Sequence, residues 1–211
     1  MSQPVTILTD LEGVWIPEVW IAVAKETGID ELLLTTRDEP NYDKLMKNRI
    51  KILRKNNITL KDIQTVIQTM DLLPGAKEAM DKLRSRYQLI ILSDTFYEFA
   101  KPFMEKLNWP TLLCHSFEVD DGVLITDYKL RMDDGKRQAA KAMKSLNYKV
   151  IGIGDSYNDT KMLKEADHGI LVHPPQNVIE EFPQFPVAND YSTLEHLIDE
   201  FSESYIIPYD L

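Results

Sequence analysis

Two acidic residues stand where the first apolar segment of the chain ends. In the stretch LTDLEGVW, at residues 8–15, Asp10 and Glu12 are two positions apart and precede Gly13. Side chains at alternate positions of an extended chain point the same way, so both acids are expected to face one spot. At about 6 Å and an effective dielectric of about 20, two such charges repel by roughly 3 kcal/mol. The pair therefore requires a nearby cation, or protonation of one carboxyl group.

More polar residues follow two later apolar segments: Ser93, Asp94 and Thr95 after the first, and Asp155, Asn158 and Asp159 after the second. Ligands of parallel sheets bind beyond the carboxyl ends of the strands, so these side chains are expected to converge. Converging carboxylates repel without a cation, and Mg²⁺ with its oxygen ligands suits them best. Asp94 and Asp155 could instead cap the helices that follow, but capping alone accounts poorly for the whole set.

Three features fit a phosphate ligand. Asp155 and Asp159 are four apart, so they share one face if a helix begins there, and a helix N-terminus attracts phosphate. Ser93 stands at a similar strand-to-helix turn, where its hydroxyl can hold a phosphate oxygen. Lys136, in RMDDGKRQAAKAM, begins a predicted helix just before the fourth strand. Without the acids, Lys136 would be interpreted as an ordinary surface lysine.

The elements that must position these residues alternate between strand and helix. Apolar runs predict buried strands at 5–10, 88–94, 111–115, 149–155 and 168–173. Helical patterns lie between most of them, which predicts an α/β fold with a parallel sheet covered on both faces. The segment 117–130 alternates around Asp121-Gly122 and predicts an added β-hairpin.

A helical insertion separates the first two strands. Helices are predicted at 17–27, 42–56 and 60–70, the last capped by Thr59 with Asp62 three residues on. Pro74-Gly75 closes the insertion, and 75–86 is predicted to be the core helix leading to the second strand. The predicted domains are an α/β core of residues 1–14 and 74–211, and a helical cap of residues 15–73.

The composition argues against several classes of protein, namely nucleic-acid-binding, membrane-spanning and secreted ones. The net charge of −10 over 211 residues argues against a nucleic-acid partner, and the basic segment 44–55 is typical of a helix with solvated lysines. No apolar run is long enough to span a bilayer, and the N-terminus lacks the pattern of a secretory signal. One cysteine, Cys114, permits no internal disulfide, so a cytoplasmic location is expected.

The motifs together resemble the haloacid dehalogenase superfamily of aspartate-nucleophile phosphotransferases. Asp10-Leu11-Glu12-Gly13 resembles the first motif, Ser93 the second, Lys136 the third, and Gly154-Asp155 through Asn158-Asp159 the fourth. All four occur in the family's order, with an insertion straight after the first. The resemblance implies a Rossmann-like core with a helical cap, and Mg²⁺-dependent chemistry on a phosphate ester.

The resemblance also implies roles for single residues. Asp10 would attack phosphorus and become an aspartyl phosphate, and Glu12 would act as general acid and then as general base. Mg²⁺ would bind the carboxylates of Asp10 and Asp155 and the main-chain carbonyl of Glu12. The remaining implied roles are phosphate binding by Ser93, charge neutralisation by Lys136, and orientation of Lys136 and the metal shell by Asn158 and Asp159. The family's usual second acid is Asp, so the longer Glu12 must reach the leaving group differently.

Arg49 and Glu18, both in the predicted insertion, are candidates for binding the substrate. Arg49 shares a predicted helix face with Leu45 and Leu53, where it either snorkels to solvent or enters the cleft to bind a carboxylate or phosphate. Glu18, after Pro17, is favoured at a helix start in any case, or it recognises an ammonium group. An acid for an amine and an arginine for a carboxylate together describe an amino-acid phosphate.

At this point the resemblance narrows to the phosphoserine phosphatase branch. DLEGVWIPEVW, SDTFYEF and GDSYNDT resemble the bacterial variant that also transfers the phosphoryl group to homoserine. Typical members have a glycine pair after the second-motif serine, where this chain has Asp94-Thr95, and this difference favours the transferase variant. Relatives of this kind are often homodimers, but the sequence does not decide the oligomeric state.

Three alternatives stay open. The same chemistry could serve another ester, such as a sugar or nucleotide phosphate. A phospho-receiver signalling domain also combines a strand-end Asp, an acidic metal site and a Lys, although the length, the helical insertion and Glu12 speak against it. A catalytically dead binding protein is the third alternative, but a competent residue occupies every expected catalytic position.

Overall fold

The computed structural model describes the chain except residues 1–2, 36–37, 40, 204 and 206–211. Seven strands form one sheet in the order β4-β3-β2-β1-β5-β6-β7. The strands are β1 (Val5–Thr9), β2 (Gln88–Phe96), β3 (Thr111–Asp120), β4 (Leu124–Lys129), β5 (Lys149–Gly154), β6 (His168–Val172) and β7 (Val187–Ala188). All neighbouring pairs are parallel except β3 and β4. The predicted α/β fold with a parallel sheet is therefore confirmed.

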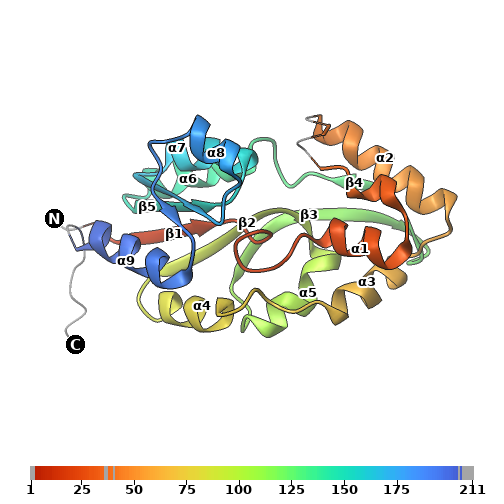
Figure 1. Ribbon diagram of the computed structural model, residues 1–211, viewed down its shortest axis with the longest axis horizontal. Helices are drawn as coiled ribbons and strands as arrows, with labels where there is room; N and C mark the ends of the chain where they lie inside the picture. Colours follow the sequence, from red (N-terminus) through yellow and green to blue (C-terminus); the bar gives the residue numbers. More distant parts are fainter. Residues whose placement is uncertain (1–2, 36–37, 40, 204, 206–211) are drawn as a thin grey trace.

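Helices cover both faces of the sheet (Figure 1). The α-helices are α1 (Val19–Thr27), α2 (Tyr42–Lys55), α3 (Leu60–Thr69), α4 (Ala76–Arg84), α5 (Tyr97–Lys106), α6 (Gly135–Ser145), α7 (Thr160–Glu165), α8 (Gln176–Glu181) and α9 (Tyr191–Ser202). Two 3₁₀ turns, η1 (Asp30–Leu33) and η2 (Tyr157–Asp159), complete the described elements. None of the helices within the described residues has the length and apolar character needed to cross a membrane.

The two faces have separate apolar cores because side chains alternate along each strand. In β1, Ile7 belongs to the core beneath α4, α5 and α9, whereas Leu8 belongs to the core beneath α6, α7 and α8. Both side chains are fully buried. Burial on both faces explains why β1 and β5 appear in the sequence as unbroken apolar runs rather than alternating ones.

Helices α1, α2 and α3 of the predicted insertion lie at one end of the molecule beside the β3–β4 hairpin (Figure 1). The last of these helices is capped as predicted, since the Thr59 hydroxyl accepts from the Asp62 backbone N–H at 3.1 Å and the Asp62 carboxylate accepts from the Thr59 N–H at 2.8 Å. The apolar core under α4 and α5 continues into the insertion, where Trp20 packs edge-on against Phe99 at 5.6 Å. The boundaries 1–14, 15–73 and 74–211 stay a prediction.

Two features differ from the sequence prediction. The predicted hairpin is present as the antiparallel pair β3 and β4, but its first strand continues the strand predicted at 111–115, because β3 runs without a break from Thr111 to Asp120. Its turn contains Asp121 and Gly122, both with positive φ, as the sequence indicated. The edge strand β7 was not predicted, since two residues carry no detectable periodicity.

Candidate active site

A buried lysine joins three carboxylates at the carboxyl end of the central strands. Asp10 directly follows β1, and its Oδ2 lies 2.7 Å from Nζ of Lys136, the second residue of α6. The same Nζ is 2.8 Å from Oδ1 of Asp159 and 3.4 Å from Oδ2 of Asp94. Asp10 Oδ1 accepts a hydrogen bond from the Leu11 backbone N–H at 2.7 Å. The topology thus brings together residues that are 126 positions apart in sequence.

The fourth-motif acids are arranged differently from the prediction. Asp155 and Asp159 do not share a helix face, because η2 intervenes and α7 begins only at Thr160. Instead, Asp159 folds back, and its Oδ2 accepts from the backbone N–H groups of Asp155 at 3.0 Å and Ser156 at 3.2 Å. Asp159 is completely buried. Both of its oxygens are therefore engaged, one by the loop and one by Lys136.

The acidic cluster carries more negative charge than its lysine can balance. Burial and the Asp159 carboxylate raise the pKa of Asp10 well above its usual value and that of Asp155 to about 7. Burial lowers the pKa of Lys136, but the Asp10 and Asp159 carboxylates outweigh it, so the pKa of this lysine is raised. Carboxylate oxygens of Asp10, Asp155 and Asp159 lie within 4.8 Å of one another. A buried, all-oxygen donor set with surplus negative charge fits a hard divalent cation such as Mg²⁺.

The carboxylate that raises the pKa of Glu12 is not Asp10, the neighbour expected from the sequence. Burial and the Glu18 carboxylate raise the pKa of Glu12 to about 7, and its Oε2 accepts from the Val19 N–H at 2.9 Å. The expected repulsion between Asp10 and Glu12 is therefore not what governs Glu12, because the chain turns after Asp10 rather than remaining extended. A carboxyl group with a pKa near neutrality can both give and take a proton.

The loop that carries these two acids is held rigidly. Trp15 donates its indole N–H to the Thr9 hydroxyl at 2.9 Å and stacks on Tyr191 with ring centroids 5.3 Å apart. The Tyr191 hydroxyl in turn donates to the carbonyl of Val14 at 2.7 Å. Such fixed contacts keep the acids in place before any ligand arrives.

A cavity of about 630 Å³ opens over the cluster. Of the residues predicted from sequence, it is lined by Asp10, Glu12, Glu18, Arg49, Ser93, Asp94, Thr95, Asp155 and Asn158, while Lys136 and Asp159 lie behind this surface. The cavity falls in the size range of pockets for small ligands, about 300–1,000 Å³. The insertion contributes one wall and the strand ends contribute the other.

Arg49 does not snorkel to solvent. Only 7% of it is exposed, its guanidinium stacks on Trp20 at 4.6 Å, and one of its terminal N–H groups donates to the carbonyl of Leu34 at 2.7 Å. Within the described residues, no carboxylate forms an ion pair with Arg49, and its buried Nε has no hydrogen-bond partner. Because Arg49 lines the cavity and has no such ion pair, its guanidinium can bind an anionic group there.

Comparison with known proteins decides the family. A model of the haloacid dehalogenase-like hydrolases matches residues 24–167. The chain is also 58% identical, over 88% of its length and 91% of the relative's, to a Pseudomonas aeruginosa protein named phosphoserine phosphatase ThrH. The chain belongs to the haloacid dehalogenase-like hydrolase family.

Further comparisons agree with this assignment. A phosphoserine phosphatase of Pseudomonas syringae pv. tomato is 54% identical over 93% of the chain and 80% of that protein. Among solved structures, a phospho-aspartyl intermediate analogue of phosphoserine phosphatase superposes with a TM-score of 0.77, covering 92% of this chain and 99% of the other at 19% identity. The resemblance inferred from the motifs is confirmed, and the family is one of enzymes rather than of phospho-receiver domains.

Tyr42 and His115 are among the site residues of this haloacid dehalogenase-like hydrolase that were not predicted from the sequence. Tyr42 lines the cavity and donates its hydroxyl to the backbone carbonyl of Asp94 at 2.9 Å, and His115 lies 3.5 Å from the Asp94 carboxylate. His115 could have been found, because the strand predicted at 111–115 ends there and strand ends line such sites. Tyr42 offered no comparable signal.

Gly13 allows the chain to pass close to the Asp155 carboxylate. Its φ is +75°, and an added Cβ would lie 2.5 Å from Oδ2 of Asp155. We therefore expect Gly13→Ala to displace Asp155 and lower kcat/KM by about 10²-fold, as misplacement of about 1 Å does elsewhere. Gly28→Ala is the matched control, because Gly28 has a φ of +66° and nothing within 4 Å of the added atom. Equal loss of activity in both variants, measured by steady-state kinetics, would contradict the packing argument.

Proposed function

We propose that this hydrolase is a Mg²⁺-dependent phosphoserine phosphatase that works through an aspartyl phosphate on Asp10. The observation that carries the proposal is one cavity in which Asp10, paired with Lys136, lies beside Glu12, whose pKa is raised to about 7. The relatives named phosphoserine phosphatase support the choice of ester.

In the first step, a carboxylate oxygen of Asp10 attacks phosphorus and the bond from phosphorus to the serine oxygen breaks. Glu12 donates its proton to the departing oxygen, which leaves as serine. In the second step, Glu12 takes a proton from water, whose oxygen attacks the aspartyl phosphate and releases phosphate and Asp10. Lys136 and the hydroxyl and N–H groups at Ser93 stabilise the charge on the phosphoryl oxygens.

Mg²⁺ would be held by the carboxylates of Asp10 and Asp155 and by the Glu12 carbonyl, and when bound it neutralises charge on the phosphoryl group. Asp159, whose oxygens are engaged by Lys136 and the loop, would orient this site rather than bind the ion directly. Asn158 donates to the Asp94 carboxylate at 3.0 Å and would act through it. Asp94 and Thr95 would complete the phosphate-binding segment that begins at Ser93.

Glu12→Gln is expected to lower kcat for phosphoserine by about 10²–10⁴-fold, the usual contribution of a general acid and base. The first step should be spared for para-nitrophenyl phosphate, since a phenolate leaves without a proton. A rapid-quench experiment would then show a burst of nitrophenol followed by slow turnover. Glu26→Gln, at an exposed position of α1, is the control. If Glu12→Gln abolished both the burst and the steady-state turnover, the role of Glu12 would be refuted.

Substrate choice is assigned to the insertion, residues 15–73, which we propose acts as a lid over the cavity. Arg49 would bind the substrate carboxylate. Glu18, which with Glu12 places two acids on the cavity wall, would bind the ammonium group. The second acceptor, homoserine, is proposed on the motif resemblance and on a cavity of about 630 Å³.

Arg49→Lys is expected to reduce kcat/KM for L-phosphoserine by about 10–100-fold, since hydrogen bonds to charged groups contribute about 1.5–3 kcal/mol. For phosphoethanolamine, which lacks the carboxylate, Arg49→Lys should reduce the already low kcat/KM by less than threefold. Arg54→Lys changes an exposed arginine of the same helix and is the control. If both substrates lost activity equally, Arg49 would be structural and not a recognition residue.

The proposed function is tested by phosphate release from L-phosphoserine with and without Mg²⁺ and homoserine, beside sugar and nucleotide monophosphates. Preference for phosphoserine, dependence on Mg²⁺ and formation of phosphohomoserine are the expected results. Turnover of another ester but not of phosphoserine would retain the chemistry and refute the assignment of Glu18 and Arg49.

A further inference from the structure

The backbone of Asp94 is displaced from the sheet. Leu92 of β2 pairs with Leu113 of β3, and Phe96 pairs with His115, so three residues of β2 face a single residue of β3. Such a bulge removes backbone groups from the ladder and directs side chains toward a site. The carbonyl of Asp94 accepts instead from the Tyr42 hydroxyl, at 2.9 Å.

Tyr42 connects two parts of the cavity wall. It is the first residue of α2, the helix that carries Arg49, and it lies 52 positions before Asp94. Its ring packs edge-on against the ring of His115 at 6.1 Å. One hydroxyl therefore fastens helix α2 of the insertion to the bulge that begins with Ser93.

His115 holds the side chain of the same Asp94. Its Nδ1 accepts from the backbone N–H of Arg131 at 3.1 Å, so Nε2 carries the proton and faces the Asp94 carboxylate at 3.5 Å. The other oxygen of Asp94 accepts from Asn158 at 3.0 Å and lies 3.4 Å from Nζ of Lys136. Burial raises the pKa of Asp94, but Lys136 and the hydrogen bond from His115 outweigh it, so this carboxyl group is ionised at neutral pH.

We propose that Tyr42, Asp94 and His115 form a latch that fixes α2 over the cavity and, through the Asp94 carboxylate, holds the ammonium group of Lys136 in place. Tyr42 and His115 are thus positioning residues, and the inference rests on the proposed function because Lys136 is a catalytic group there. The latch couples closure over the substrate to the geometry of the phosphate site.

The test compares Tyr42→Phe with Tyr128→Phe. The Tyr128 ring also packs against Tyr42, but its hydroxyl donates to the exposed Asp43 at 2.8 Å, so it joins the hairpin to the same helix without touching Asp94. Loss of one hydrogen bond predicts about a tenfold fall in kcat for Tyr42→Phe with KM changed less than kcat. Amide hydrogen exchange in residues 46–52 of α2 should accelerate by about tenfold in the same variant. Tyr128→Phe should leave kcat unchanged and accelerate exchange in residues 46–52 by less than Tyr42→Phe does, because the hydrogen bond that it removes is exposed.

Equal exchange rates and equal kcat in the two variants would overturn the latch. Failure of the wild-type enzyme on phosphoserine would instead refute the proposed function. The kcat comparison would then be made with para-nitrophenyl phosphate, and the exchange measurement, which needs no substrate, would decide the latch independently.

Discussion

Asp10→Asn is expected to abolish phosphate release, with a loss of about 10⁴-fold or more, and to leave the protein folded. An amide is a far weaker nucleophile than a carboxylate, and loss of a nucleophile elsewhere costs up to about 10⁶-fold. The amide would also donate where Asp10 now accepts from Leu11 or Lys136. This conflict is offset by relief of repulsion with Asp159 and Asp155, so the free energy of unfolding should change by less than about 1–2 kcal/mol.

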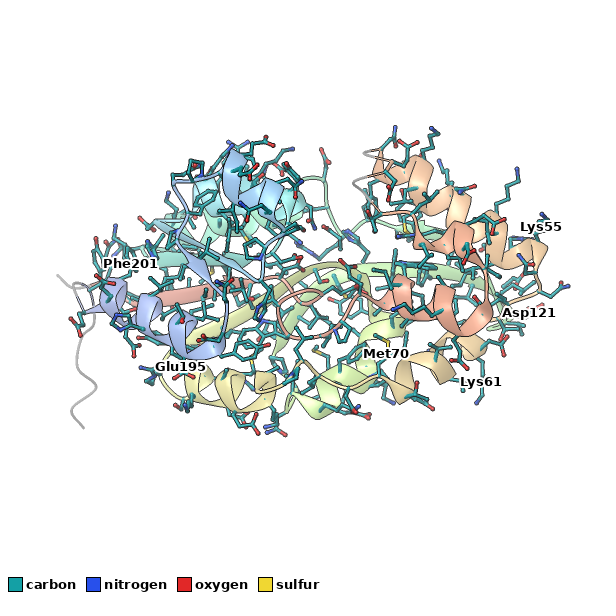
Figure 2. All side chains as sticks on the ribbon, in the orientation of Figure 1. Lys55, Lys61, Met70, Asp121, Glu195 and Phe201 are labelled. Carbon is teal, nitrogen blue, oxygen red and sulfur yellow. The ribbon has the colours of Figure 1, made fainter. Side chains whose placement is uncertain are left out.

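The matched control is Asp121→Asn, which makes the same chemical change at the exposed tip of the hairpin. Figure 2 shows Asp121 at the end of the molecule near Lys55 and Lys61. Its φ of 40° is also one that Asn tolerates. The free energies of unfolding of the two variants, measured by urea titration, should differ by less than about 1–2 kcal/mol. Only Asp10→Asn should lose activity. Residual activity above about one-hundredth of wild type would exclude Asp10 as the nucleophile.

Lys136→Met is expected to destabilise the protein by about 3–5 kcal/mol, because it leaves buried carboxylates without their cation. The Lys136 ammonium lies 2.7 Å from Asp10 and 2.8 Å from Asp159, and methionine keeps only the apolar stem. Saturating Mg²⁺ should restore part of the lost stability, since an ion that binds only the folded state adds about 2.7 kcal/mol at 100 times its Kd. Urea unfolding with and without Mg²⁺ measures both effects.

Lys141→Met is the control for this substitution, since Lys141 is exposed on the same helix. It should change the free energy of unfolding by less than about 0.5 kcal/mol. The double variant with Asp10→Asn should be destabilised by less than the sum of the single variants, because each carboxylate removed lowers the cost of losing the lysine. If Lys136→Met alone lowered the free energy of unfolding by less than about 1 kcal/mol, the carboxylate cluster would have to be neutralised without this lysine.

The sequence was informative wherever a residue's place follows from topology alone. Asp10, Ser93 and Asp155 were predicted to converge because each ends a parallel strand, and the structure places all three on one cavity. The Thr59 cap was equally readable, because its partner lies three residues away. These features depend on strand order and local spacing, which a sequence records directly.

Features that depend on side-chain packing were not readable. The repulsion expected between Asp10 and Glu12 assumed an extended chain, whereas the turn after Asp10 brings Glu18 to Glu12 instead. The bulge at 93–95 and the bond from Tyr42 to Asp94 join segments whose distance apart is set only by the folded insertion. Neither leaves a pattern in the sequence.

The most direct test of the aspartyl-phosphate mechanism is to quench the enzyme in acid during its first turnover of L-phosphoserine with Mg²⁺ and to locate the phosphoryl group by mass spectrometry. We expect a phosphorylated peptide whose modified residue is Asp10, and no such peptide in Asp10→Asn. Phosphate release at the wild-type rate with no phosphoryl group on Asp10, or with one on another residue, would contradict it.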